Sequence, residues 1–475
     1  HSSFEQGFKN TFQDLVYFSA VYWWFHNDFD QLNQCISWRV NLKAFAIRAS
    51  VFKQLLPPDS DYKTSMMQGL DFGFNALKHS GVVVYYVKGL FPTANDVEKI
   101  PAFDRYLFYK RHFKIEHRWY MYFRKGFWKP QELIGLWKSS KYLPKFQQAK
   151  ILQPKPLKPL TTTPSVAYII PTMGRQLLTR QLLNDLNVQT YMPSQVIVVD
   201  ATPDKDWDDD AYNHRFNFEL EVYRQQSKGS CRARNEALAR VKTDYVVFGD
   251  DDIRVPPNYI ESHLKFLETY QVKAAYGLDI RADHQEQNLN DLQRKLDTIP
   301  EAVRWRTGPA YGFNNANSAI HRSCLDLVPG NDINYDGGYG EDRDFGLMLL
   351  KKGITVLHNP YAVNLHLKPP SGGYRIWAKQ ARTKGKNRKK QPWELDTPVG
   401  WIRPVPSPTK MYEFLKHFRS NQRKEYKIKY FIFYLTKKPL WAFPLRLLNL
   451  PFRLLQYRKS AFYAKKLLNL GPRYQ

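Results

Sequence analysis

Three consecutive aspartates, Asp250, Asp251 and Asp252, follow directly on an apolar run that begins at Tyr245 and reads as a buried strand. Carboxylates crowded onto one turn repel each other unless a positive charge lies among them. Mg²⁺ and Mn²⁺ take oxygen ligands and are commonly held by one or two carboxylates together with substrate phosphates. The triplet therefore predicts a divalent-cation site. An acidic turn that only caps the helix after Pro256–Pro257 is the alternative.

The elements that must position this turn alternate between strand and helix over residues 166–277. The apolar runs are Val166–Pro171, Gln195–Asp200, Leu220–Arg224, Tyr245–Asp250 and Lys273–Gly277, and polar stretches with helical spacing separate them. Strands that alternate with helices predict crossover connections and a parallel sheet. The expected fold class is therefore α/β, with a mixed, mostly parallel sheet flanked by helices.

Polar residues stand where three of these strands end, at Pro171–Thr172, Asp200 and Asp250. Ligands of open α/β sheets bind outside the carboxyl ends of the strands, so these groups are expected to face one crevice. The chain contains neither a G-x-G-x-x-G fingerprint nor a phosphate-binding G-x-x-x-x-G-K-[ST] loop. A dinucleotide site and a P-loop are therefore not indicated.

An internal repeat gives the N-terminal part its interpretation. Two pairs of segments correspond, Asp71–Gly73 with Asp344–Gly346 and Asn41–Arg48 with Asn317–Arg322. In this register Gln68 and Gly69 stand at the places of Glu341 and Asp342. Residues 1–125 are therefore predicted to be a partial, degenerate copy of a similar domain without its acids. Chance similarity between two helix–turn–strand units is the alternative.

At 475 residues the chain is long enough for two or three domains. A proline-rich stretch predicts a linker over residues 126–164, followed by an α/β domain over 165–370 and a separate C-terminal region over 371–475. The sequence has no run of about 18 apolar residues that could span a membrane. It starts with His1, from which we expect that the original N-terminus has been removed.

The net charge of +27 is concentrated at one end of the chain. Residues 375–475 hold 25 Lys and Arg against four acids, a net charge of +21, and residues 382–390 are expected to form a flexible basic loop. Basic amphipathic segments with aromatic anchors bind anionic membrane surfaces, so we expect a peripheral membrane contact here. Nucleic acid would also attract the charge, but no recognisable nucleic-acid module accompanies it. Packing against the α/β domain is the remaining alternative.

Residues 165–370 resemble the family-2 glycosyltransferases of the GT-A fold. The resemblance rests on five motifs in order: Ile170–Thr172 with Arg175, Val198–Asp200, Gly229 with Ala233–Asn235, Asp250–Asp252, and Gly340–Asp342. It implies a GT-A sheet in this domain and a partial GT-A-like copy at the N-terminus. It also implies Mn²⁺ or Mg²⁺ as cofactor and a nucleotide-diphosphate sugar as donor.

The resemblance implies a nucleotide pocket and assigns residues to it. Asp200 is similar to the acid that contacts the nucleoside base, and Ala201 stands where many relatives have a second acid, which leaves the nucleotide open. The other substrate-binding candidates are Pro171, Thr172, Arg175, Gly229, Arg234, Asn235, Asp250 and Asp251. For Arg234 and Asn235, polarity at a helix N-terminus is an equal alternative.

The resemblance also implies the metal ligands and the base. Asp250 and Asp252 are similar to the ribose-side and metal-binding members of the acidic motif, and His366 to a third ligand. Asp342, with Glu341 beside it, is similar to the general base. A poorly nucleophilic hydroxyl needs such a carboxylate to take its proton, and a cation stabilises a diphosphate leaving group. A single base fits direct displacement with inversion.

The expected function is inverting, metal-dependent transfer of a sugar, of the hexosyl type, to a hydroxyl of a glycan or lipid-linked acceptor. Bacterial surface polysaccharide synthesis is the expected setting, with a cytoplasmic protein peripheral on the inner face of the plasma membrane and no nucleic-acid partner. The alternative is a non-catalytic polyanion- or membrane-binding protein that keeps a degenerate glycosyltransferase fold.

Overall fold

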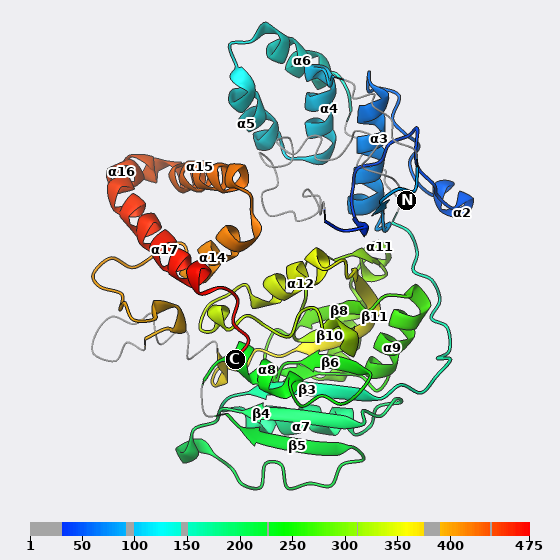
Figure 1. The fold of residues 1–475 in the computed structure, drawn as a ribbon, viewed down its shortest axis with the longest axis vertical. Coiled ribbons are helices and arrows are strands. Elements are labelled where there is room, and N and C mark those ends of the chain that lie inside the picture. The colour runs from blue at the N-terminus through cyan, green and yellow to red at the C-terminus, as the bar shows by residue number, and fades with distance from the viewer. Residues whose placement is uncertain are drawn as a thin grey trace.

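The computed structural model describes residues 31–91, 99–143, 151–225, 228–310, 312–374, 390–437 and 439–475 (Figure 1). The predicted basic loop 382–390 lies outside the described residues, apart from Lys390. In Figure 1 the α/β domain fills the lower half of the molecule, and two groups of helices lie above it and to its left.

A nine-stranded sheet forms the centre of the α/β domain. Its strands are β3 (Val166–Thr172), β4 (Gln195–Asp200), β5 (Glu219–Arg224), β6 (Tyr245–Gly249), β7 (Ile253–Arg254), β8 (Ala274–Arg281), β9 (Gly308–Pro309), β10 (Asn317–His321) and β11 (Val356–His366). The order is β5-β4-β3-β6-β10-β8-β11-β7, and β9 pairs with β11. The predicted α/β class with a mixed, mostly parallel sheet is confirmed.

The sheet departs from a plain parallel series at β10. This strand lies antiparallel between β6 and β8 and is not among the predicted strands. The last strand of the predicted series also continues to Arg281, four residues beyond Gly277, and runs parallel to β11. The ends of β3 and β4 are in register, with Thr172 opposite Asp200, so their polar residues reach the same edge as expected.

Helices cover both faces of the sheet. They are α7 (Gln176–Leu186), α8 (Ser230–Leu238), α9 (Tyr259–Tyr270), α10 (Leu289–Asp297), α11 (Glu301–Arg304) and α12 (Glu341–Lys351), with short 3₁₀ turns at Asp204–Asp206, Arg322–Cys324 and Ile333–Tyr335. Along β3, Tyr168 packs into the cluster that contains α7 and α9, whereas Ile169 packs into the one that contains α8 and α12. Strands buried on both faces are therefore apolar throughout, which explains the uninterrupted runs in the sequence.

The N-terminal region is a smaller α/β unit followed by three helices. Its elements are β1 (Gln34–Ile36), α2 (Ala49–Phe52), α3 (Ser65–Phe74), a π-helical turn (Asn75–His79), β2 (Tyr85–Val87), α4 (Ala102–His112), α5 (Ile115–Gly126) and α6 (Pro130–Ser140). Helix α6 lies inside the predicted linker 126–164, yet it packs on α4 and buries Leu136. The linker prediction is corrected here, because residues 130–140 carry an apolar helical face.

The C-terminal region is helical, as predicted. It contains 3₁₀ turns (Pro392–Glu394 and Leu440–Ala442), α14 (Pro408–His417), α15 (Ser420–Thr436), α16 (Phe443–Leu448) and α17 (Leu450–Leu470). Pro444 and Pro451 stand in the first turns of α16 and α17, where a missing backbone N–H does no harm. Within the described ranges, none of the helices is both long and apolar enough to cross a membrane.

Candidate active site

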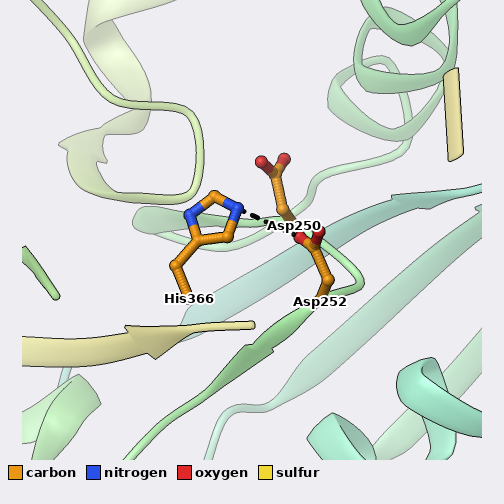
Figure 2. A group of neighbouring side chains, drawn as sticks. All are labelled: Asp250, Asp252 and His366. Carbon is orange, nitrogen blue, oxygen red and sulfur yellow. Dashed lines mark ion pairs between the residues drawn. The ribbon is translucent and has the colours of Figure 1, made fainter. Parts of the chain in front are cut away.

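The acidic triplet forms the turn between β6 and β7. The strand before it is buried, and the turn directs two of the three carboxylates toward His366 at the end of β11. Asp250, Asp252 and His366 each offer one ligand atom, and these atoms all lie within 4.8 Å of one another (Figure 2). The three predicted metal ligands are therefore brought together, and their spacing fits a single divalent cation.

His366 is fixed from both sides of its ring. Its Nε2 lies 3.3 Å from an oxygen of Asp252 (Figure 2). Its Nδ1 lies 3.1 Å from an oxygen of Asp279. Burial disfavours the charged ring, but the hydrogen bonds to Asp252 and Asp279 outweigh it and raise the pKa of His366 to about 9. A carboxylate on the far nitrogen of a histidine fixes its orientation, as in many metal sites.

Asp251 points toward the sheet rather than toward His366. It accepts a hydrogen bond from the Thr172 hydroxyl at 2.8 Å and one from Arg175 at 3.0 Å. Arg175 also donates to Asp252 at 2.9 Å. Burial and the neighbouring charge of Asp252 raise the pKa of Asp251 to about 7, and Arg175 partly offsets them. Arg175 and Thr172 thus hold the acidic turn in shape.

Arg234 links the acidic turn to the second acidic pair. It lies buried on α8 and donates a hydrogen bond to Asp250. Although burial favours the neutral guanidinium, the charges of Asp250, Asp342 and Glu341 raise its pKa above the usual value. The Arg234 guanidinium therefore lies between the two groups of acids and keeps them close despite their like charge.

Asp342 lies in the first turn of α12, where a carboxylate is favoured by the helix dipole. The turn before it requires Gly340, whose φ of 117° is in a region that other residues avoid. The backbone N–H of Asn315 donates to Asp342 over 3.4 Å. Burial and the charge of Glu341 raise the pKa of Asp342 to about 7, against the effect of Arg234. A carboxylate with such a pKa is suited to act as a base near neutral pH.

A cavity of about 530 Å³ joins these groups. The predicted residues that line it are Pro171, Arg175, Arg234, Asp250, Asp251, Asp252, Glu341, Asp342 and His366. Four further cations or donors line it as well: Arg281, Arg343, Lys368 and Tyr374. A cavity with acids at two places and several cations between them can hold a polyanion and a metal ion together.

Two predicted nucleotide residues serve the local fold in the structure and are absent from the described cavity lining. Asp200 accepts hydrogen bonds from the backbone N–H of Thr202 and from the hydroxyl of Tyr212, at 2.8 and 2.7 Å. Thr172 is buried beneath Asp251. Both residues shape the strand ends, and direct contact with a nucleotide remains a prediction for them.

Gly229, which precedes α8, and Asn235, which lies within that helix, are likewise engaged with the protein. A side chain at Gly229 would collide with the carboxylate of Asp336. The amide of Asn235 donates to the carbonyl oxygens of Asn331 and Tyr474, each at 2.8 Å. Asn235 therefore ties α8 to two distant segments of the chain, and its contact with a nucleotide stays a prediction.

Sequence reasoning missed Asp279, Arg281, Arg343 and Lys368. Arg343 directly follows Asp342, and Lys368 lies two residues after His366, so their positions in the chain could have suggested them. Asp279 and Arg281 offered no comparable pattern, because they lie in the part of β8 that extends past the predicted strand. Tyr374, which the sequence assigns to the C-terminal region 371–475, donates to Gln225 at 2.6 Å.

The helix that carries Asp342 is held by the C-terminal region. Two residues further along, Asp344 is buried and accepts hydrogen bonds from Tyr335 at 3.0 Å and from Lys416 at 2.9 Å. His417 Nε2 lies 2.6 Å from the same carboxylate. Lys416 and His417 come from α14, so packing of the basic region against the α/β domain, one of the alternatives, is observed. The start of α12 therefore depends on α14.

Residues 168–326 match the model of the family described as glycosyl transferase family 2. The match lies within the α/β domain and shows that this part of the chain is similar to that family. No match was found among curated proteins.

Three solved structures show distant similarity. The mannosyltransferase PcManGT from Pyrobaculum calidifontis, in complex with GDP-Man and Mn²⁺, is 17% identical over 66% of this chain and 89% of its own, with a TM-score of 0.36. S. aureus TarS 1-349, in complex with UDP-GlcNAc, is 14% identical over 66% of this chain and 93% of its own, with a TM-score of 0.37. GalNAc-T7, with UDP, GalNAc and Mn²⁺, is 13% identical over 59% of each chain, with a TM-score of 0.36. These scores are too low to assign residue roles.

Proposed function

We propose that this chain is an inverting, metal-dependent glycosyltransferase that uses a nucleotide-diphosphate sugar. The observation that carries the proposal is the shared cavity, in which Asp250, Asp252 and His366 lie together and Asp342 lines the same space. The family match of residues 168–326 supports glycosyl transfer as the class of reaction.

Asp250, Asp252 and His366 would hold Mn²⁺ or Mg²⁺. Two carboxylates and an imidazole suit Mn²⁺, and the hydrogen bond from His366 to Asp279 leaves Nε2 directed at Asp252. A bound divalent cation neutralises charge on the departing diphosphate. Within this chain, Arg175 and Arg234 keep the acidic turn compact, and Arg281 and Lys368 add positive charge to the wall.

Asp342 is the proposed general base. Its raised pKa lets it accept a proton from an acceptor hydroxyl near neutral pH, while that oxygen attacks the anomeric carbon and the bond to the diphosphate breaks. Glu341 lies beside it on the first turn of α12 and favours proton uptake through its charge. One base on the acceptor side supports inversion of the anomeric centre.

The acceptor we propose is a hydroxyl of a glycan or of a lipid-linked saccharide, and the sugar moved is a hexosyl group. Synthesis of a bacterial surface polysaccharide is the proposed setting. The exposed basic helices support a cytoplasmic protein that is peripheral on the inner face of the plasma membrane.

The test is release of nucleoside diphosphate from a panel of nucleotide sugars by the purified chain, with Mn²⁺, with Mg²⁺ and with chelator. We expect slow donor hydrolysis that chelator abolishes. Asp252→Ala should remove metal-dependent donor binding in calorimetry, whereas Asp342→Asn should keep binding and lose turnover. Turnover that survives chelator would overturn the metal role. Failure of every donor to bind would favour the non-catalytic alternative.

A further inference from the structure

The N-terminal region repeats the hydrogen bonds of the α/β domain at a constant spacing. Asn41 accepts from the backbone N–H of Lys43, and Asn314 accepts in the same way from Ala316. The two pairs are 273 positions apart (314 minus 41). This register differs by three residues from the one that the sequence suggested, which placed Asn41 opposite Asn317.

The same spacing recurs at a buried cluster. Asp71 accepts from the Tyr62 hydroxyl at 2.6 Å, and His112 Nε2 lies 2.6 Å from the same carboxylate. This arrangement matches the contacts of Asp344 with Tyr335 and His417. The tyrosine and the aspartate keep the 273-residue spacing in both regions.

The repeat extends into the helices. His112 ends α4 as His417 ends α14, and the two residues are 305 positions apart (417 minus 112). Helix α4 packs on α6, and α14 packs on α17. We call α4–α6 the first helical unit and α14–α17 the second helical unit.

The two helical units meet through corresponding positions. Tyr120 on α5 donates to Glu425 on α15 at 2.6 Å, and Arg124 donates to the same carboxylate at 2.6 Å. The ammonium of Lys429 lies 5.4 Å from the centre of the Tyr120 ring. With the 305-residue spacing, position 120 corresponds to 425 and 124 to 429. The contact therefore uses the same patch of both helices, as in an isologous two-fold interface.

Both helical units expose large apolar side chains at the end of the paired helices. Trp128 is 70% exposed and Phe127 is 53% exposed after α5. The corresponding positions on α15 are Phe433, 57% exposed, and Ile432. Each unit exposes further apolar residues: Trp119, Phe123, Leu133, Ile134 and Trp137 in the first unit, and Trp441, Phe443, Leu445, Leu448 and Phe452 in the second.

Both helical units are rich in basic residues. Residues 114–141 contain seven Lys and Arg against two acids, and one of these acids, Glu132, is buried in contact with Arg105 and Tyr106. The second unit belongs to the C-terminal segment with a net charge of +21. Aromatic side chains with Lys and Arg around them match the headgroup region of an anionic bilayer.

We propose that the two helical units together form a docking surface with two contact points for an anionic lipid membrane. The second unit contains the basic C-terminal helices, and the first unit is an additional anchor beside them. The proposal deepens the peripheral location proposed above and is independent of the transfer chemistry. Two anchors on one rigid body bind more strongly than either alone, because docking of the first raises the local concentration of the second. Figure 1 shows the units as neighbours on one side of the molecule.

The experiment is co-sedimentation of the full chain with vesicles of phosphatidylcholine and phosphatidylglycerol in equal parts, compared with phosphatidylcholine alone. The first-unit variant is Phe127→Ser with Trp128→Ser, and the second-unit variant is Ile432→Ser with Phe433→Ser. Each should lower the partition coefficient about tenfold, and their combination about a hundredfold. The matched control is Trp401→Ser, because Trp401 is fully exposed and lies outside both units.

Three outcomes would overturn the proposal. In the first outcome, the wild-type chain does not bind anionic vesicles, or it binds neutral vesicles equally well. In the second outcome, the first-unit variant binds as the wild type does while the second-unit variant is impaired, which would leave only the basic C-terminal anchor. In the third outcome, the patches instead mediate self-association. Gel filtration would then show dimers that the variants abolish without any effect on lipid binding. Thermal unfolding at the wild-type temperature verifies that each variant is folded.

Discussion

Asp342 combines a position in the cavity with a pKa raised to about 7 by burial and by Glu341. A base must be ionised to accept a proton, so kcat/KM should rise with pH and level off above about 7. Asp342→Asn should lower turnover about a thousandfold at every pH, and Glu341→Gln should shift the rise to lower pH without abolishing turnover. The measurement is donor hydrolysis across neutral pH. A flat profile for the wild type would contradict the assignment.

Asp279 touches His366 but none of the proposed reacting groups, so we treat it as a positioning residue. Asp279→Asn should weaken Mn²⁺-dependent binding of a nucleoside diphosphate by about 10- to 100-fold, because the imidazole loses the carboxylate that orients it. Calorimetric titration with and without Mn²⁺ measures the effect. Asp283→Asn is the control, since Asp283 pairs with Lys295 at the surface. Equal affinity for both variants would show that His366 needs no such support.

At the residue scale, the sequence predicts the acids of the site better than its cations. Asp250, Asp252 and Asp342 follow glycine or apolar runs that mark the ends of strands and loops. Their positions can therefore be predicted from the local sequence pattern. Arg281 reaches the same cavity only because β8 and β11 run side by side, with Arg281 opposite His366. That pairing joins residues far apart in the chain, and no local pattern encodes it.

At the element scale, α14 is tied to α12 by the cluster around Asp344. His417→Ala would leave a buried carboxylate with one fewer partner and should cost about 1–3 kcal/mol of stability. It should also lower kcat, since the first turn of α12 carries Asp342. His112→Ala is a matched control, because it removes the same contact from Asp71 in the N-terminal region. Chemical denaturation and donor hydrolysis measure both effects.

The two variants separate a local effect from a general loss of stability. We expect comparable destabilisation from both but reduced turnover only for His417→Ala. If His112→Ala lowers kcat equally, the link between α14 and the base has no special role. If neither variant is destabilised, the buried clusters contribute little to the fold.

The elements themselves were predictable to the extent that each strand is buried on both faces. The runs at β3, β4 and β6 are continuous and apolar, and polar helical stretches separate them. Strand β10 was missed because its Asn317 and Ser318 are polar yet buried, with Asn317 bound to Asn364 at 2.7 Å across the sheet. Such a polar strand reads as a loop until its long-range partner is known.

At the scale of the whole molecule, one apolar cluster extends from α3–α6 into α14, α15 and α17. The two helical units therefore share a core, although about 300 residues separate them in the chain. The sequence predicts a repeat from two pairs of corresponding segments, and this repeat stays a prediction. The correspondence of α4 with α14 could not be predicted, because at the 305-residue spacing the two helices share only their final histidine and the phenylalanine after it.

The α5–α15 contact fixes the spacing of the two exposed patches, so it should influence membrane docking from a distance. Glu425→Ala removes the acceptor that Tyr120 and Arg124 share, while both patches stay intact. Vesicle partition should fall, but by less than the tenfold expected for a one-patch variant, because the spacing of the anchors loosens while the shared core still joins the two units. Glu261→Ala, which breaks a surface pair with Lys265, is the control. Wild-type partition for Glu425→Ala, measured beside impaired patch variants, would show that the patches dock without a fixed geometry, and the two-fold contact would then serve folding alone.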